Sequence, residues 1–276
     1  MLSLIAHHRE VAAGGTALTV VAYGSVSADG RSFASQLLVG PLARAGLTAL
    51  SSAVHEEGGA VGLQLTHAGS FSKPQHGGEH QPPIAPSRIF NPADMNFARE
   101  MTPADMTRVC NDFASAGAVA VQCGIDAIEL HLGHGYLLSQ FLSPYSNRRS
   151  DGFGGSIANR LRFPLRVVRA VRAAVGERVA LLVKFNLSDG FVGGLVLDDA
   201  IAVGQALHAT GCVDLLVPSG GWITRNGLFM LRGAVPLHEM VAAQPLAMMR
   251  WSLRLFGRHY VPTLPWREHF FEEAAL

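Results

Sequence analysis

The stretch DAIELHLGHGYLLSQF, residues 126–141, joins a short apolar run to three reactive side chains. The apolar run has the length of a strand buried on both faces, as parallel strands under covering helices are. Strand alternation places Glu129 and His131 on one face. His134 and Tyr136 follow where the chain leaves the strand. Reactive groups gather at this carboxyl end of the strands in parallel α/β proteins, so the stretch predicts a buried parallel strand that ends in a functional site.

Apolar runs and helical segments alternate on both sides of this stretch. Helix signals include a start at Thr102, Pro103 and Asp105 and a stop at Gly176. The predicted strands are 16–23, 60–67, 126–132, 179–186 and 213–219. The predicted helices are 2–13, 41–57, one that begins at 102, 156–175 and 198–210. Each connection is long enough for a crossover, so the strands should form one parallel sheet.

Two α/β architectures fit this order, an open doubly wound sheet and a TIM-type barrel. No GxGxxG motif follows a predicted strand, which disfavours the dinucleotide-binding open sheet. No GxxxxGK[ST] phosphate loop is present either. A barrel needs about 250 residues, and its near-continuously apolar strands are covered outside by helices.

Two segments break the alternation. Residues 68–101 are rich in proline and glycine and are predicted to form one long loop. Residues 222–276 hold all three tryptophans and no clear strand. We therefore expect a barrel domain at 1–221, with the later residues forming a helical and irregular extension that packs on it. Three arginines spaced four residues apart would share one helix face of this extension: Arg250, Arg254 and Arg258. Such a face is either solvated or contacts a membrane surface or a partner.

The composition argues against several classes of function. A net charge of +1 and a pI of about 7.9 give no electrostatic footprint for nucleic acid. Cys110, Cys123 and Cys212 are far apart and odd in number, which favours a reducing, cytoplasmic setting without a disulfide framework. No apolar run reaches the roughly 18 residues of a membrane span. The first residues are too charged for a secretory signal.

His131, His134 and Tyr136 are suited to chemistry at an oxygen atom. Two imidazoles can donate two N–H bonds to one oxygen and stabilise charge that grows on it. A neighbouring phenol is a neutral acid at pH 7 and can deliver a proton. Other readings stay open: satisfied core histidines, polar loop residues, or a metal site with Glu129 as the nearest third ligand.

Two further polar side chains stand within apolar runs. Lys184 ends the run ALLVK, where a charge is costly unless it is paired. It would form a Schiff base or face an anionic cofactor. Gln64 places an amide near a strand end, either as a satisfied buried group or as a ligand group that donates and accepts.

Three stretches carry a resemblance to a known family. Residues 126–176, VGLQLTHAGS at 61–70 and AAGGTALTVVAYGSVSADGR at 12–31 resemble the old yellow enzyme family. Its members are FMN-dependent NAD(P)H oxidoreductases, also called ene-reductases or NADH:flavin oxidoreductases. The resemblance covers 10–221 well, and 222–270 is similar to an extension in one branch of the family.

The resemblance implies a role for each candidate residue. His131 and His134 would hold the oxygen of an enone, quinone or phenol, and Tyr136 would protonate the acceptor after the flavin delivers hydride. Three residues would contact the FMN: Gln64 at the pyrimidine, Lys184 where other members use arginine, and Tyr23 in the second strand. Lysine offers the charge without the bidentate fork of arginine. Other motif residues would brace loops: Asn147, Arg148, Asp151, Asn159 and Arg160.

The family barrel has eight strands, and the five predicted here correspond to strands two to six. We therefore expect an incomplete barrel, without the first strand and without the seventh and eighth, which cradle the phosphate in the family. The expected function is hydride transfer from NADH or NADPH through FMN to a small-molecule acceptor, in a possible homo-oligomer. The alternatives are a Schiff-base lyase using Lys184, a metal-dependent barrel lyase or hydrolase using His131 and His134, and a cofactor-free remnant.

Overall fold

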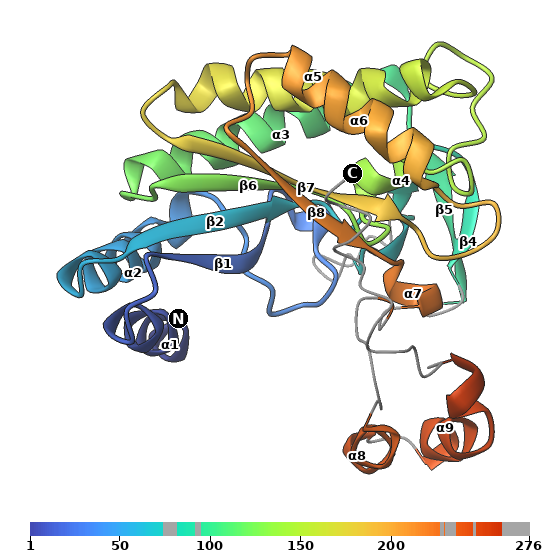
Figure 1. Cartoon of the computed structure of the whole chain (residues 1–276), viewed down its shortest axis with the longest axis horizontal. Coiled ribbons are helices and arrows are strands. Elements are labelled where there is room, and N and C mark those ends of the chain that lie inside the picture. Colours follow the sequence, from blue (N-terminus) through green and yellow to red (C-terminus); the bar gives the residue numbers. More distant parts are fainter. Residues whose placement is uncertain (74–81, 92–94, 227–228, 230–235, 245–246, 261–276) are drawn as a thin grey trace.

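The computed structural model describes residues 1–73, 82–91, 95–226, 229, 236–244 and 247–260. Its centre is a five-stranded parallel sheet in the order β1-β2-β6-β7-β8 (Figure 1). The strands are β1 (Leu18–Ser25), β2 (Ala60–Thr66), β6 (Ala127–Leu132), β7 (Ala180–Ser188) and β8 (Leu215–Gly220). Each lies within about two residues of a predicted strand at both ends, so the predicted parallel sheet is confirmed.

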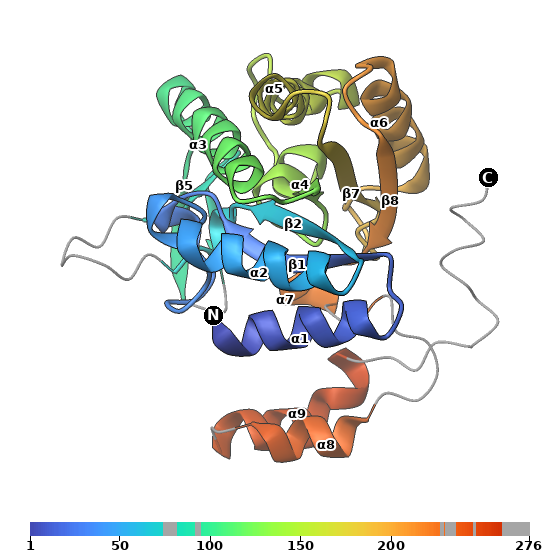
Figure 2. The same cartoon turned by 90° about the vertical axis from the view of Figure 1, so that its left-hand side faces the viewer.

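Five long helices follow one another around the outside of this sheet. They are α1 (Leu2–Ala13), α2 (Arg44–Glu56), α3 (Pro103–Gln122), α5 (Ile157–Val175) and α6 (Leu197–Ala209). Successive helices contact each other, and Figure 2 shows them as an arc around the strands. Neighbouring parallel strands in chain order, with helices outside, are the arrangement of a TIM-type barrel. Within the described part of the chain β1 and β8 are the edges of the sheet, as expected for an incomplete barrel.

Local signals set the ends of these helices. Thr102 accepts the N–H of Asp105, and the Asp105 carboxylate accepts the N–H of Thr102, which forms the predicted start of α3 as a capping box. The side chain of Ser156 caps the start of α5 by accepting the backbone N–H of Asn159. α5 ends at Gly176, whose φ of +71° suits glycine.

The prediction of one long loop at 68–101 is wrong in its described part. A 3-10 turn, η3 (Gly69–Phe71), is followed by β3 (Ile84–Ala85), β4 (Ile89–Asn91) and β5 (Asn96–Glu100). These strands form a separate small sheet in the order β3-β5-β4. They are two to five residues long, which is too short for a clear periodic pattern in a segment rich in proline and glycine. Residues 74–81 and 92–94 of that prediction lie outside the described residues.

Several further helices complete the described chain. They are η1 (Ala28–Gly30), η2 (Pro41–Ala43), α4 (Leu137–Leu142), α7 (Ile223–Asn226), α8 (Leu237–Ala243) and α9 (Ala247–Tyr260). α8 and α9 contact each other, and Trp222 is 1% exposed beside the sheet. Arg250 and Arg254 lie on α9 as predicted, and the side chain of Arg258 lies outside the described residues. The division of the chain at 221 and the packing of the extension stay predictions.

No helix in the described ranges is both long and apolar enough to cross a membrane.

Candidate functional site

The carboxyl half of the sheet brings four of the predicted site residues onto three adjacent strands. Gln64 on β2 pairs in register with Glu129 on β6, and His131 on β6 pairs with Lys184 on β7. His134 and Tyr136 follow β6 at the start of α4. Parallel register therefore gathers residues that are far apart in the sequence at one end of the sheet.

His131 and His134 stand perpendicular to each other. Their ring centroids are 4.9 Å apart with an interplanar angle of 87°. The N–H of Gly133 donates to Nδ1 of His131 over 3.2 Å, so the proton of the neutral ring lies on Nε2. Nε2 of His134 is 2.7 Å from Oγ of Ser219. When that hydroxyl donates, Nδ1 of His134 carries the N–H, and each ring keeps one donor for a ligand oxygen.

Both histidines are neutral at pH 7. Burial first, and then the charges of His134 and Lys184, lower the pKa of His131 well below its usual range. Burial and then Lys184 lower the pKa of His134 to about 4. The pair can therefore donate to a developing oxyanion but is a poor source of the proton itself.

Asn186 holds the loop that carries His134. Its Oδ1 accepts the backbone N–H of His134 over 3.0 Å, and its Nδ2 donates to Oδ1 of Asp189 and to the carbonyl of Gly221. His134 has a φ of +60°, which costs a non-glycine residue free energy unless such contacts fix it. Sequence reasoning missed Asn186, whose only signal is a polar residue inside the apolar run of β7.

Tyr136 lies beside His131 and is bonded to Tyr23. The ring centroids of Tyr136 and His131 are 4.8 Å apart, and the Tyr136 hydroxyl donates to Oη of Tyr23 over 2.8 Å. Burial first, and then this bond, raise the pKa of the Tyr136 phenol well above its usual range. Tyr136 is therefore a protonated phenol at pH 7. Tyr23, expected to contact FMN, here bonds both Tyr136 and Oγ of Ser32 (2.8 Å).

Glu129 connects Gln64 and Lys184. Its Oε1 accepts from Nε2 of Gln64 over 2.5 Å and lies 3.2 Å from Nζ of Lys184. The sequence by itself indicates Glu129 only as a possible metal ligand. Within the described ranges no three His, Cys, Asp or Glu side chains are grouped so that they could hold a metal ion.

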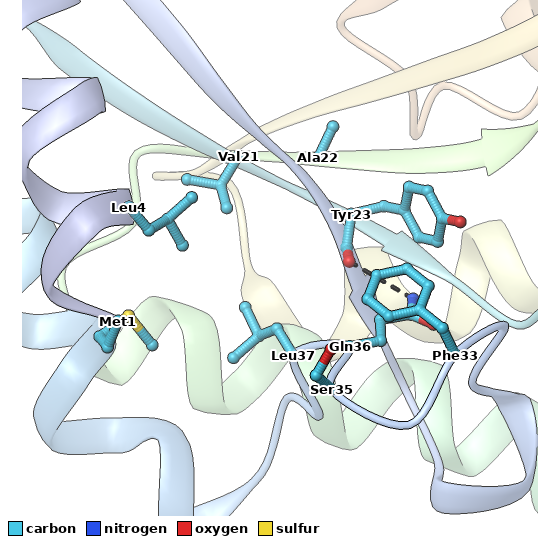
Figure 3. A pocket seen from close by; sticks show the side chains of 9 residues that line it. All are labelled: Met1, Leu4, Val21, Ala22, Tyr23, Phe33, Ser35, Gln36 and Leu37. Carbon is cyan, nitrogen blue, oxygen red and sulfur yellow. Dashed lines mark hydrogen bonds between the residues drawn. The ribbon is translucent and has the colours of Figure 1, made fainter. Parts of the chain in front are cut away.

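A cavity of about 280 Å³ adjoins this site at the edge strand β1. Figure 3 shows Tyr23 on its wall, with Phe33 and Gln36 from the following segment and Leu4 from α1. Neither His131 nor His134 lines this cavity.

An aromatic cluster lies beside the histidine loop. Trp222 contacts Phe71, Tyr145 and Phe191 edge to face, with ring centroids 5.6–6.2 Å apart. A Cβ on Gly135 would lie 2.5 Å from the Trp222 ring, so only glycine fits there. The backbone N–H of Ile223 donates to the carbonyl of His134, which ties the cluster to the site.

Residues after α4 brace the loop as expected. Asn147 donates to the carbonyls of Phe141 and Phe153, and Asn159 donates to that of Gly154. Arg160 donates to the carbonyl of Leu142 and pairs with Asp199. Arg148 donates to the carbonyl of Tyr145. Asp151 accepts from Arg149, a buried guanidinium that sequence reasoning missed and that also holds the carbonyls of Pro86 and Met101.

Comparison with known proteins identifies the family. The NADH:flavin oxidoreductase / NADH oxidase family model matches residues 2–215. The chain belongs to this family. FMN is therefore the cofactor and NADH or NADPH the reductant of the class to which it belongs, and the resemblance to old yellow enzymes is confirmed.

Individual relatives agree with this assignment. The chain is 43% identical to a 4,4'-dithiodibutanoate disulfide reductase of Rhodococcus erythropolis, over 97% of this chain and 66% of that protein. It is 37% identical to an NADPH dehydrogenase of Geobacillus sp., over 85% of this chain and 67% of that protein. An old yellow enzyme from Pichia sp. has the same fold, with a TM-score of 0.67, 24% identity, and coverage of 76% of this chain and 60% of that one. The chain thus spans about two thirds of the length of these two relatives.

The donor set at the strand ends fits the pyrimidine edge of a flavin. That edge offers carbonyl oxygens and one N–H, so it needs donors, one acceptor and a positive charge near N1. Gln64 offers an amide oxygen, and Lys184 offers an ammonium group on a side chain that is 27% exposed. Gln64 and Lys184 would therefore hold FMN here.

Proposed function

We propose that this chain contains the acceptor-binding site of an FMN-dependent NAD(P)H oxidoreductase, which reduces an activated alkene, enone or quinone-like acceptor. The observation that supports this proposal is the perpendicular His131–His134 pair with the protonated Tyr136 beside it. Bound FMN would supply the hydride, which it receives from NADH or NADPH.

The roles of the three side chains follow from their contacts. His131 and His134 donate to the acceptor oxygen and stabilise the negative charge that grows on it. Because both are neutral, they orient the acceptor without protonating it. Tyr136 gives its hydroxyl proton to the acceptor carbon. That O–H donates to Tyr23 in this structure, so it turns toward the acceptor to react, and the Tyr23 hydroxyl can then donate to the Tyr136 oxygen.

The test is FMN binding followed by ligand binding. Quenching of flavin fluorescence on titration with wild-type protein measures the first step, and the change of the flavin spectrum on addition of a phenol measures the second. We expect FMN to bind both the wild type and a His131→Ala/His134→Ala variant, and phenol to perturb the spectrum only in the wild type. His208→Ala, an exposed histidine on α6, is the matched control. Absence of FMN binding by the folded wild type would overturn the proposal and favour the cofactor-free remnant.

A carboxylate-bearing disulfide is the second candidate acceptor. One relative is named a 4,4'-dithiodibutanoate disulfide reductase. The guanidinium of Arg225 lies 4.8 Å from the centroid of Tyr145 and 4.3 Å from that of Phe191, and it makes no ion pair with any described residue. A guanidinium packed against two aromatic rings is suited to bind a substrate carboxylate. The reaction would convert one disulfide, NAD(P)H and a proton into two thiols and NAD(P)+.

The two acceptor classes are separated by turnover. FMN-loaded protein is assayed with a cyclic enone, with dithiodibutanoate and with its neutral diamide. Preference for the dicarboxylate over the diamide, lost in Arg225→Gln, supports the second candidate. Equal rates for both disulfides, or rates far below the enone rate, contradict it.

The remaining alternatives have less support. A Schiff-base lyase needs a free amine, and Lys184 is engaged by Glu129. A metal enzyme needs a third ligand, which the described residues do not offer near the histidines. A cytoplasmic location and a homo-oligomeric state stay predictions.

A further inference from the structure

Glu129 is a buried carboxylate that the proposed reaction does not use. It is 4% exposed, lies on the central strand β6, and has its partners on the two flanking strands. A buried charge is costly unless it is paired and hydrogen-bonded. Its partners are the two residues that would contact the pyrimidine of FMN, Gln64 and Lys184.

The contact with Gln64 fixes the orientation of the amide. Because Nε2 of Gln64 donates to Glu129 over 2.5 Å, the amide oxygen must point away from the carboxylate. Gln64 then presents an acceptor, which suits the N–H of a pyrimidine ring. Without the carboxylate the amide is free to turn over and present its donors instead.

The contact with Lys184 fixes the position of a charge. The ammonium group lies 3.2 Å from Oε1 of Glu129 on a side chain that is 27% exposed, and it keeps further N–H donors for a ligand. Lys184 reaches Glu129 across the β6–β7 pair, where its own register partner is His131. The ion pair therefore holds the long lysine side chain within the site rather than extended into solvent.

We propose that Glu129 is a positioning residue, which sets the amide of Gln64 and the ammonium of Lys184 for the flavin pyrimidine and moderates the positive charge there. This inference rests on the proposed function. The carboxylate offsets part of the lysine charge, so reduced flavin is stabilised less than it would be by Lys184 alone.

The first arm of the test needs no cofactor. Lys73 and Lys184 are the only lysines in the chain, so acylation by an amine-reactive ester can be followed at each by mass spectrometry. In apo protein we expect Glu129→Gln to raise the acylation rate of Lys184 several-fold and to leave Lys73 unchanged. Glu10→Gln, at an exposed position on α1, should change neither rate. An unchanged rate at Lys184 in Glu129→Gln would overturn the positioning role.

The second arm measures the midpoint potential of bound FMN. We expect Glu129→Gln to make the midpoint potential more positive by about 30 mV, which corresponds to a tenfold change in the two-electron reduction equilibrium. Lys184→Gln should shift it the opposite way, and Glu10→Gln should not shift it. A negative shift in Glu129→Gln would overturn the moderating role. Should Glu129→Gln fail to fold, Glu129→Asp shortens the side chain by one methylene and is expected to raise Lys184 acylation less.

The two arms separate this inference from the proposed function. If the wild type takes up no FMN, the proposed function fails, and the acylation rates still decide whether Glu129 positions Lys184. If FMN binds and the rates do not respond to Glu129→Gln, the proposed function stands and this inference fails.

Discussion

The hydroxyl of Tyr136 donates a 2.8 Å hydrogen bond to the hydroxyl of Tyr23, which lies 113 residues earlier in the chain. The same Tyr23 hydroxyl lies 2.8 Å from Oγ of Ser32, and Tyr23 also lines the cavity at β1. The proposed acid is thus connected by two hydroxyl groups to a segment near solvent. This connection allows Tyr136 to regain a proton, through Tyr23, after it has given one away.

Removal of the Tyr136 hydroxyl should slow acceptor reduction more than removal of the Tyr23 hydroxyl. We expect Tyr136→Phe to lower the rate by about 10²–10⁴, the range of one general acid. Tyr23→Phe should lower it less, because the acid is still present and has lost only the hydroxyl partner of its oxygen. Reoxidation of reduced, FMN-loaded protein by an enone in a stopped-flow instrument measures both. Equal rates for Tyr23→Phe and wild type would show that the Tyr23 bond has no part in proton delivery.

The histidine pair should make the folded state less stable in acid. The pKa of His134 is about 4 in the folded state, below its ordinary value of 6.5. The unfolded chain therefore binds a proton as pH falls below about 6.5, whereas the folded chain does not until about 4. Stability attributable to His134 is present above pH 6.5 and is lost between pH 6.5 and 4, and His131 acts in the same direction. The loss from His134 is at most about 3.5 kcal/mol, for a shift from 6.5 to about 4 at about 1.4 kcal/mol per pKa unit.

Urea unfolding at pH 7.5 and pH 5 measures this loss. His134→Gln should unfold with a smaller difference between the two pH values than the wild type does. An identical difference in wild type and variant would mean that His134 titrates normally in the folded protein.

Asn186→Ala should weaken the acceptor site more than the cofactor site. The change removes the partner of the His134 N–H and leaves that buried donor unsatisfied, at a cost of about 1–3 kcal/mol in stability. We expect phenol affinity to fall about tenfold and FMN affinity to stay near that of the wild type, measured by the two spectroscopic titrations. Asn159→Ala is the control, because Asn159 bonds only the distant Gly154 carbonyl with its side chain. A loss of FMN affinity that equals the loss of phenol affinity would contradict a local role.

Gly135→Ala should destabilise the protein for two separable reasons. The new Cβ would lie 2.5 Å from the Trp222 ring, and φ at this position is +78°. Overpacking costs about 1–3 kcal/mol, and the left-handed backbone adds about 1–2 kcal/mol. In a double-mutant cycle with Trp222→Leu the overpacking part should disappear and the backbone part should remain, as read from urea unfolding. If the changes in the free energy of unfolding simply add in the double variant, a clash between the new Cβ and the Trp222 ring is excluded.

Much of the fold could be predicted because its signals are local. The apolar runs located all five strands of the central parallel sheet, and Thr102, Asp105 and Gly176 marked helix ends through contacts within one or two turns. The pairing of β3 with β5 could not be predicted, because strands of two to five residues carry too little periodicity. α4 was missed for a similar reason: all its residues are buried, so it has no amphipathic pattern.

The sequence by itself determined the parallel α/β order and put His131, His134 and Tyr136 at the end of one strand, because their spacing of two and three residues needs no distant partner. Only the tertiary structure decided what those groups face. Asn186 meets His134 over 52 residues, Tyr23 meets Tyr136 over 113, and Gln64 meets Glu129 over 65. These pairs form because parallel register brings distant strands to one edge, and side-chain hydrogen bonding between strands leaves no periodic trace in the sequence.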